Sequence, residues 1–297
     1  MYCKKIFMLI MTILLLISAS SNIFAIHMNA GASVWYAWWD PMWENAFKGD
    51  AVDNPDNYST DDPSFSMDPS FLAGPALSFT LNPLWSISAS FMYGKYDADS
   101  TASYFSAGGF EYKELSSISI DKMESDVMAS RKITDIFKFY FGIKFQRYAI
   151  NEERKVENYD MIGTLLDQHI VDYDETGNGI GSGAGIGITQ RLYDNFFLLA
   201  NVSAILMWNN LDRTTTRNDD TTFSPDIDYN IDFLTWGANT TASIAYYIAP
   251  ASVTLAIGGR YQHLRYKQLN QKDERDLDGN TDNFYGITFS ALYGFEI

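Results

Sequence analysis

The feature that most constrains the fold is a series of segments in which apolar and polar residues alternate with a period of two. Period two places successive side chains on opposite faces of a β-strand. In one segment Phe139, Phe141 and Ile143 share a face, while Lys138 and Lys144 take the other. The pattern predicts an all-β chain of about ten strands, at residues 28–39, 70–81, 85–96, 122–133, 137–150, 179–192, 195–209, 231–247, 251–267 and 283–297.

The connections between these segments alternate strictly between short and long. Short ones lie at residues 82–84, 134–136, 193–194 and 249–250, and long ones at 40–69, 97–121, 151–178, 210–230 and 268–282. An even number of long strands, with tight turns at one rim and long loops at the other, is typical of membrane β-barrels. The sequence therefore predicts a closed antiparallel transmembrane β-barrel with short periplasmic turns and five long external loops.

The N-terminus has the layout of a secretory signal peptide. Lys4 and Lys5 precede an apolar run over residues 6–17, which small residues follow as far as Ala25. The run is much shorter than the roughly 20 residues of a membrane-spanning helix. We expect residues 1–25 to be cleaved, which removes the single cysteine, and residues 26–297 to form the barrel.

The charge balance limits the partners of the mature chain. Without Lys4 and Lys5 it keeps 19 of 21 basic residues against 37 acidic ones, a formal charge of −18. Such a charge disfavours nucleic acid and anionic surfaces. No second apolar stretch reaches 18 residues, so closed β-structure is the remaining way to satisfy the backbone in a bilayer.

The end of the chain resembles the last strand of bacterial outer-membrane barrels. Apolar or aromatic residues occupy alternate positions from Tyr285 through Phe289 and Tyr293 to the terminal Ile297. In that class such a strand is the signal that the barrel-assembly machinery reads. The resemblance implies an outer-membrane location, with the lipid bilayer and this machinery as partners.

Inward-facing positions carry charges of both signs. The alternation predicts that seven charged residues face the lumen: Glu124, Asp126, Lys132, Lys138, Lys144, Arg191 and Arg260. Paired charges fill a narrow barrel, and ten strands enclose far less than a wide porin. Glycines at every second position from 177 to 187 do not match a phosphate-binding loop. From Gly181 onward they should face the lumen and make room for larger side chains.

Two acidic segments resemble parts of calcium-binding loops. Asp172 and Asp174 match the first half of a calcium loop, and Asp276, Asp278 and Asp282 offer oxygen ligands around a glycine turn. Neither segment has the glutamate that completes such a loop. Solvated acidic turns are the plainer interpretation, and we expect no bound metal or cofactor.

The ten-stranded layout is similar to that of the omptin proteases, which activate water between an Asp-x-Asp and an Asp-x-His pair. Asp97 and Asp99 match the first pair. The fourth loop has no histidine, and Asp167 with His169 lies in the third loop instead. We therefore favour a structural or surface-interaction barrel with acidic loops, or a narrow channel for small solutes. Its expected partner is an extracellular ligand or small solute, and an omptin-like endopeptidase is the alternative.

Overall fold

The computed structural model describes residues 27–42, 64–105, 110–217, 229–270 and 279–296. The predicted signal peptide lies outside this part of the chain. Within it the sequence forms eleven strands, with one short 3-10 turn at Ala249–Ala251. The strands are β1 (His27–Asp40), β2 (Ser64–Met67), β3 (Ser70–Thr80), β4 (Trp85–Phe105), β5 (Glu111–Lys132), β6 (Phe137–Tyr159), β7 (Leu165–Tyr193), β8 (Phe196–Arg217), β9 (Tyr229–Ile248), β10 (Val253–Gln268) and β11 (Thr281–Glu296).

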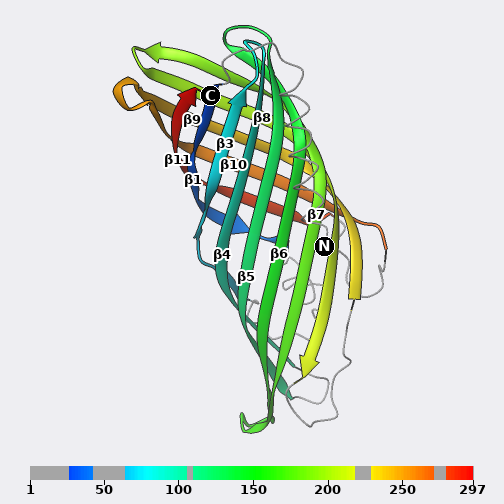
Figure 1. The fold of residues 1–297 in the computed structure, drawn as a ribbon. Coiled ribbons are helices and arrows are strands. Elements are labelled where there is room, and N and C mark those ends of the chain that lie inside the picture. Colours follow the sequence, from blue (N-terminus) through cyan, green and yellow to red (C-terminus); the bar gives the residue numbers. More distant parts are fainter. Residues whose placement is uncertain (1–26, 43–63, 106–109, 218–228, 271–278, 297) are drawn as a thin grey trace.

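All strands except β2 form one closed antiparallel ring (Figure 1). Neighbours in the chain are neighbours in the ring, and β1 closes it by pairing with both β3 and β11. The short β2 continues the line of β3 along β4, where it pairs with residues 98–101. The predicted closed barrel is confirmed. None of the helical turns in the described residues has the length and apolar character needed to cross a membrane.

The short turns lie where they were predicted, and polar side chains organise them. Asn82 Oδ1 accepts hydrogen bonds from the backbone N–H groups of Leu84 and Trp85, both at 2.9 Å. Thr134 Oγ1 likewise accepts hydrogen bonds from the N–H groups two and three residues further on. Such side-chain bonds replace a backbone turn and favour a tight reversal.

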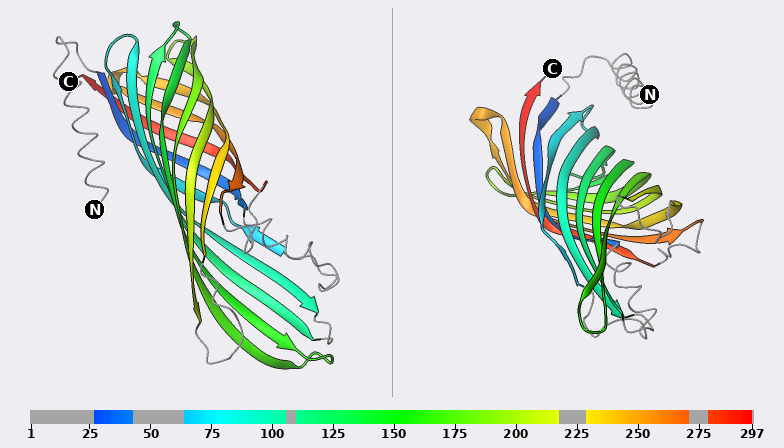
Figure 2. Two further views of the ribbon diagram at one scale, coloured as in Figure 1. Left: turned by 90° about the vertical axis from the view of Figure 1, so that its right-hand side faces the viewer. Right: turned by 90° about the horizontal axis from the view of Figure 1, so that it is seen from below.

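The opposite end differs from the prediction, because the strands continue through much of the predicted loops. β6 runs to Tyr159 and β7 begins at Leu165, so the expected loop 151–178 reduces to a turn over 160–164. β4, β5 and β8 also extend well into regions that were predicted as loops. Figure 2 shows β4 to β7 continuing past the ring as a curved sheet, which we call the extension.

Near the short turns the outer face of the ring, which points away from the barrel axis, is apolar. On β6, Phe139, Phe141 and Ile143 are each at least 40% exposed, and Leu206 and Trp208 on β8 are also exposed. A surface of this kind is stable only against lipid, and a closed ring leaves no strand edge unpaired there. We call this part of the ring the membrane band.

Further along the same strands the apolar side chains move to the inner face. On β6, Tyr148 and Ile150 are buried inside, whereas Asn151 and Glu153 are exposed outside. We call the side of the membrane band away from the short turns the upper side. Above the band the outer face of the sheet meets water, and apolar side chains pack against one another on its inner face. Because the apolar residues change from the outer to the inner face, the alternation of apolar and polar residues is interrupted along the strand. This explains why β4 to β8 were predicted to be shorter than they are.

The buried inner residues form one apolar cluster, which we call the plug. Trp39 of β1 packs on Phe284, with ring centroids 4.8 Å apart, and on Tyr96 at 5.1 Å. Its ring also lies 5.6 Å from Tyr148 on β6. Aromatic side chains from distant strands therefore meet inside the upper part of the barrel.

Candidate functional site: a charged layer across the lumen

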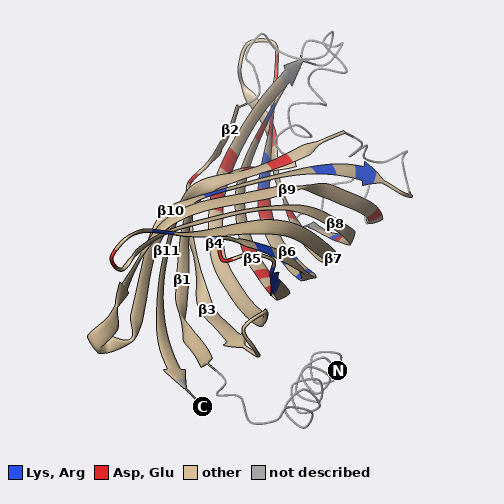
Figure 3. Ribbon diagram, turned by 90° about the horizontal axis from the view of Figure 1, so that it is seen from above, with Lys and Arg blue, Asp and Glu red and all other residues tan. Residues whose placement is uncertain are grey.

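A layer of charged side chains lies below the plug, on the inner faces of β5, β6 and β10. Period two brings Glu124 and Asp126 to the inner face of β5, and the register sets Asp126 opposite Lys144 of β6. β10 contributes Arg260, which is part-buried. Figure 3 shows charged residues on several strands around the ring, while β1 and β3 carry almost none.

Glu124 is the centre of this layer. Its carboxylate forms ion pairs with Lys122 at 2.9 Å, Lys144 at 3.0 Å and Arg260 at 3.2 Å. Its side chain is 2% exposed and that of Lys122 is fully buried. Buried ions are tolerated only when they are well paired, so removing one partner leaves a costly uncompensated charge. The layer is therefore a coupled set.

The pair between Glu124 and Arg260 crosses the lumen. Around the ring, β6 to β9 separate β5 from β10 on one side, and β4, β3, β1 and β11 separate them on the other. The two strands thus face each other, yet their side chains meet at 3.2 Å. Arg260 also donates to Asn239 at 3.0 Å and Gln262 at 3.1 Å, and its guanidinium lies 4.2 Å from the Trp35 ring centroid. At this level an ion pair therefore joins opposite walls of the lumen.

Lys122 joins the charged layer to the plug. Its ammonium lies 4.3 Å from the ring centroids of both Tyr148 and Phe284, and it donates to the Tyr148 hydroxyl at 3.0 Å. Cations bind aromatic faces most strongly where water is excluded. Asp282 is buried in the plug, where Trp39 Nε1 donates to it at 3.3 Å and a backbone N–H at 2.6 Å.

A glycine on β7 gives the neighbouring amides room. Gln146 donates to Asn209 at 2.8 Å across β7, at the position of Gly179. A Cβ on Gly179 would lie 2.0 Å from Asn209 Oδ1. The absence of a side chain at Gly179 thus leaves room for Gln146 and Asn209, which is the role that the sequence predicted for the alternate glycines of β7.

A second ionic cluster lies in the extension, above the membrane band. Glu152 accepts hydrogen bonds from Ser116 and Arg154, both at 2.8 Å, and Arg213 lies 3.8 Å away. Burial raises the pKa of Glu152, but the two guanidinium groups and the Ser116 hydroxyl outweigh it, so the pKa falls below its usual 4.5. Arg213 also pairs with Glu175 at 3.0 Å. The cluster ties β5, β6, β7 and β8 together.

The seven charges predicted to face the lumen fall into two groups. Glu124, Asp126, Lys144 and Arg260 meet in the layer, with Asp126 bonded to Lys144 at 3.4 Å. The others lie at the short-turn end, where Lys132 and Lys138 oppose each other. Arg191 is exposed there and donates to the Asp194 carbonyl at 2.5 Å.

Sequence reasoning missed Lys122, although it continues the even-numbered inward series of Glu124 and Asp126. It also missed the aromatic residues of the plug. Trp39 is the last residue of the predicted strand 28–39, and Phe284 is the second residue of the predicted strand 283–297.

The calcium candidates do not form a loop site. Asp172 and Asp174 lie within β7 on its outer face, where Asp172 pairs in register with Glu153 of β6. The predicted loop here was wrong, because the strand runs through it. Asp282 is buried in the plug, while Asp276 and Asp278 fall outside the described residues. The described residues contain no cluster of three or more side chains suited to a metal ion.

The four residues that match the omptin pattern are not brought together. Asp97 and Asp99 are exposed on the outer face of β4. His169 is buried on the inner face of β7, and Asp167 is exposed near the tip of that strand. β5 and β6 lie between the two pairs.

No protein-family model and no curated protein matches this chain. Several solved structures resemble it in fold. The outer membrane protease OmpT from Escherichia coli has a TM-score of 0.47 and 9% identity, over 94% of this chain and 99% of that one. The translocator domain of the autotransporter NalP from Neisseria meningitidis has a TM-score of 0.37 and 9% identity, over 93% and 90% of the two chains. A major outer membrane protein from Thermus thermophilus has a TM-score of 0.34 and 10% identity, over 91% and 99%.

Proposed function

We propose that this protein is an outer-membrane barrel that does not conduct and acts at the cell surface through its extension. The observation that carries the proposal is the 3.2 Å contact between Glu124 and Arg260, which face each other across the ring. The plug lies directly above it. A solute would have to break at least one buried ion pair and part the aromatic rings to pass.

The outer face of the extension supports a surface role. Asp99, Glu153 and Asp174 are exposed there, and so is Asp97, which pairs with Lys95 at 3.5 Å. The chain has a formal charge of −16. An acidic face of this kind attracts cationic partners over about a Debye length, roughly 8 Å at physiological salt. We propose a cationic extracellular peptide or protein segment as the ligand class.

Planar-bilayer recording tests the closed lumen. We expect the refolded protein to insert without single-channel steps, with insertion confirmed by a heat-dependent gel shift. Regular conductance steps from the unmodified protein would contradict the proposal and favour a narrow channel.

Binding of a labelled oligolysine peptide to intact cells tests the surface role. We expect binding that weakens with salt and falls in a variant carrying Asp97→Asn, Asp99→Asn and Glu153→Gln. Asp135→Asn, in a short turn on the other side of the membrane, is the matched control. Equal binding by both variants would exclude the acidic face as the ligand site.

A further inference from the structure

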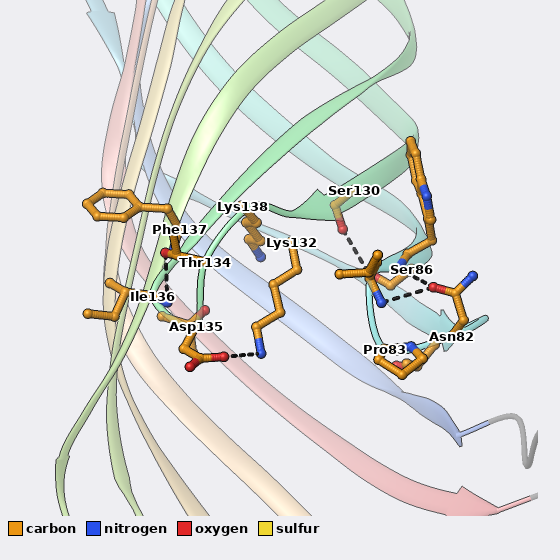
Figure 4. Close-up of a pocket in the computed structure, with 14 residues that line it drawn as sticks. Asn82, Pro83, Ser86, Ser130, Lys132, Thr134, Asp135, Ile136, Phe137 and Lys138 are labelled. Atoms are coloured by element: carbon orange, nitrogen blue, oxygen red, sulfur yellow. Dashed lines mark hydrogen bonds and ion pairs between the residues drawn. The ribbon is translucent and has the colours of Figure 1, made fainter.

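A pocket of about 280 Å³ opens at the short-turn end of the barrel (Figure 4). It lies where the β3–β4 turn, the β5–β6 turn and the end of β7 meet. Two lysines line it together with hydroxyl groups, including those of Ser86, Ser130 and Thr189. The Ser86 and Ser130 hydroxyls bond to each other at 2.7 Å, and the Asp135 carboxylate also lines the pocket.

The two lysines are cross-strand neighbours, and the repulsion between their charges makes this arrangement unfavourable. Lys132 and Lys138 are directly opposite in the register of β5 and β6, and like charges in such a pair destabilise a sheet. Asp135 offsets one of them, at 2.8 Å from Lys132. Lys138 is half-buried and has no ion pair or hydrogen bond among the described residues. One ammonium group in the pocket thus remains uncompensated.

Local structure holds the Lys138 side chain in place. It lies over Gly187 of β7, where a Cβ would come within 2.6 Å of the Lys138 Cε. The missing side chain at Gly187 is what allows the lysine to lie inward along the wall. The position is built by two strands and is not a freely solvated surface lysine.

The residues around the pocket include a further cation and several exposed apolar side chains. Arg131 lies beside the pocket, with its guanidinium 5.7 Å from the Trp85 ring centroid. Leu84, Ile136 and Phe137 line the pocket and are each at least 40% exposed. A positive site in a chain with a formal charge of −16, bordered by exposed apolar side chains at the rim of the short turns, fits a ligand with an anionic head and an apolar tail.

We propose that this pocket binds the phosphate of an anionic phospholipid from the leaflet on the short-turn side. Lys138 and Lys132 provide the charge, and the Thr189 hydroxyl offers a donor to the phosphate oxygens. The Ser86 and Ser130 hydroxyls bond to each other at 2.7 Å, so this pair has one further proton to donate. Charge-assisted hydrogen bonds of this kind are about twice as strong as neutral ones. The inference rests on the membrane placement proposed above. A free organic phosphate shares the same chemistry, so the experiment separates the two sources.

Native mass spectrometry of the refolded protein in detergent provides the test. The protein is titrated separately with phosphatidylglycerol, phosphatidylcholine and free glycerol phosphate. We expect one phosphatidylglycerol to bind more tightly than the others, and Lys138→Gln to weaken it about tenfold, as for the loss of one charged contact. Lys138→Arg should restore most of the binding. Arg191→Gln, which removes a rim cation outside the pocket, should leave it unchanged.

Each outcome bears on the proposal. Equal binding of phosphatidylglycerol by the parent and by Lys138→Gln would overturn it, and so would equal loss in Arg191→Gln. Tight binding of glycerol phosphate that is lost in Lys138→Gln would assign the pocket to a soluble phosphate and overturn the lipid source. A heat-dependent gel shift shows independently that each variant is a folded barrel, so failure of the membrane placement is recognised separately.

Discussion

At the residue scale, buried acids in this barrel are held by paired charges. Glu124 is almost completely buried, and three cations contact it within 3.2 Å. In the extension, Glu152 is held in the same way by Arg154 and Arg213. Each buried carboxylate is tolerated because cations on its own strand and on other strands pair with it. The charged form of each is therefore part of the fold.

The Glu152 cluster makes the stability of the extension depend on pH. Folding lowers the pKa of Glu152 below 4.5, so the unfolded chain binds its proton more tightly than the folded one. The carboxylate thus stabilises the fold above about pH 4.5, and this contribution is lost as the pH falls through the lowered pKa. We predict that Glu152→Gln lowers the free energy of unfolding at pH 7 by about 1.5–3 kcal/mol.

Urea unfolding at pH 7 and pH 3 measures this effect. The difference between the parent and Glu152→Gln should be smaller at pH 3 than at pH 7, because the parent carboxylate takes up a proton as the pH falls through its lowered pKa. Glu153→Gln is the matched control, since Glu153 is the next residue along β6 and is exposed on the outer face. A constant difference between the parent and Glu152→Gln at both pH values would rule out the ionic role.

At the scale of the element, β6 shows two environments in one strand. Phe139, Phe141 and Ile143 face outward in the membrane band, and Tyr148 and Ile150 face inward above it. The strand keeps its period of two throughout, but the apolar face changes sides. The surrounding medium, lipid below and water above, decides which face is apolar.

Arginine substitutions on the outer face of β6 test this change of environment. We predict that Phe141→Arg, in the middle of the outward apolar run of β6, destabilises the folded barrel by about 2–4 kcal/mol. Asn151→Arg, on the same face of the same strand but above the band, should change stability by less than about 0.5 kcal/mol. Unfolding in lipid vesicles gives both values. Similar losses for the two variants would show that the membrane band has been misplaced along the strand.

At the scale of the whole molecule, the barrel is uneven. β4 to β7 continue past the ring on one side, and the turn at 160–164 forms the tip between β6 and β7. Asp160 stabilises that turn by accepting hydrogen bonds from the N–H groups of Ile162 at 3.0 Å and Thr164 at 2.7 Å. These backbone bonds lower the pKa of Asp160. The tip of the extension, between β6 and β7, is thus an ordered hairpin turn.

Epitope tags test the orientation of the barrel. We predict that a tag inserted after Gly163 reacts with antibody on intact cells, because the 160–164 turn lies at the end opposite the short turns. A tag after Asn82 should react only after the outer membrane is permeabilised. The reverse pattern would invert the topology, and it would also place the lysine pocket on the cell surface.

The sequence by itself determined the strand-and-turn plan of the barrel. Period two is a local property of the backbone, and the turns at Asn82 and Thr134 are organised by bonds to residues only two or three positions away. Only the tertiary structure decided how far the strands extend and what fills the lumen. Glu124 meets Arg260 across 136 residues of sequence, and Trp39 meets Tyr148 only because the ring closes. Such contacts depend on closure and register, which no local pattern encodes.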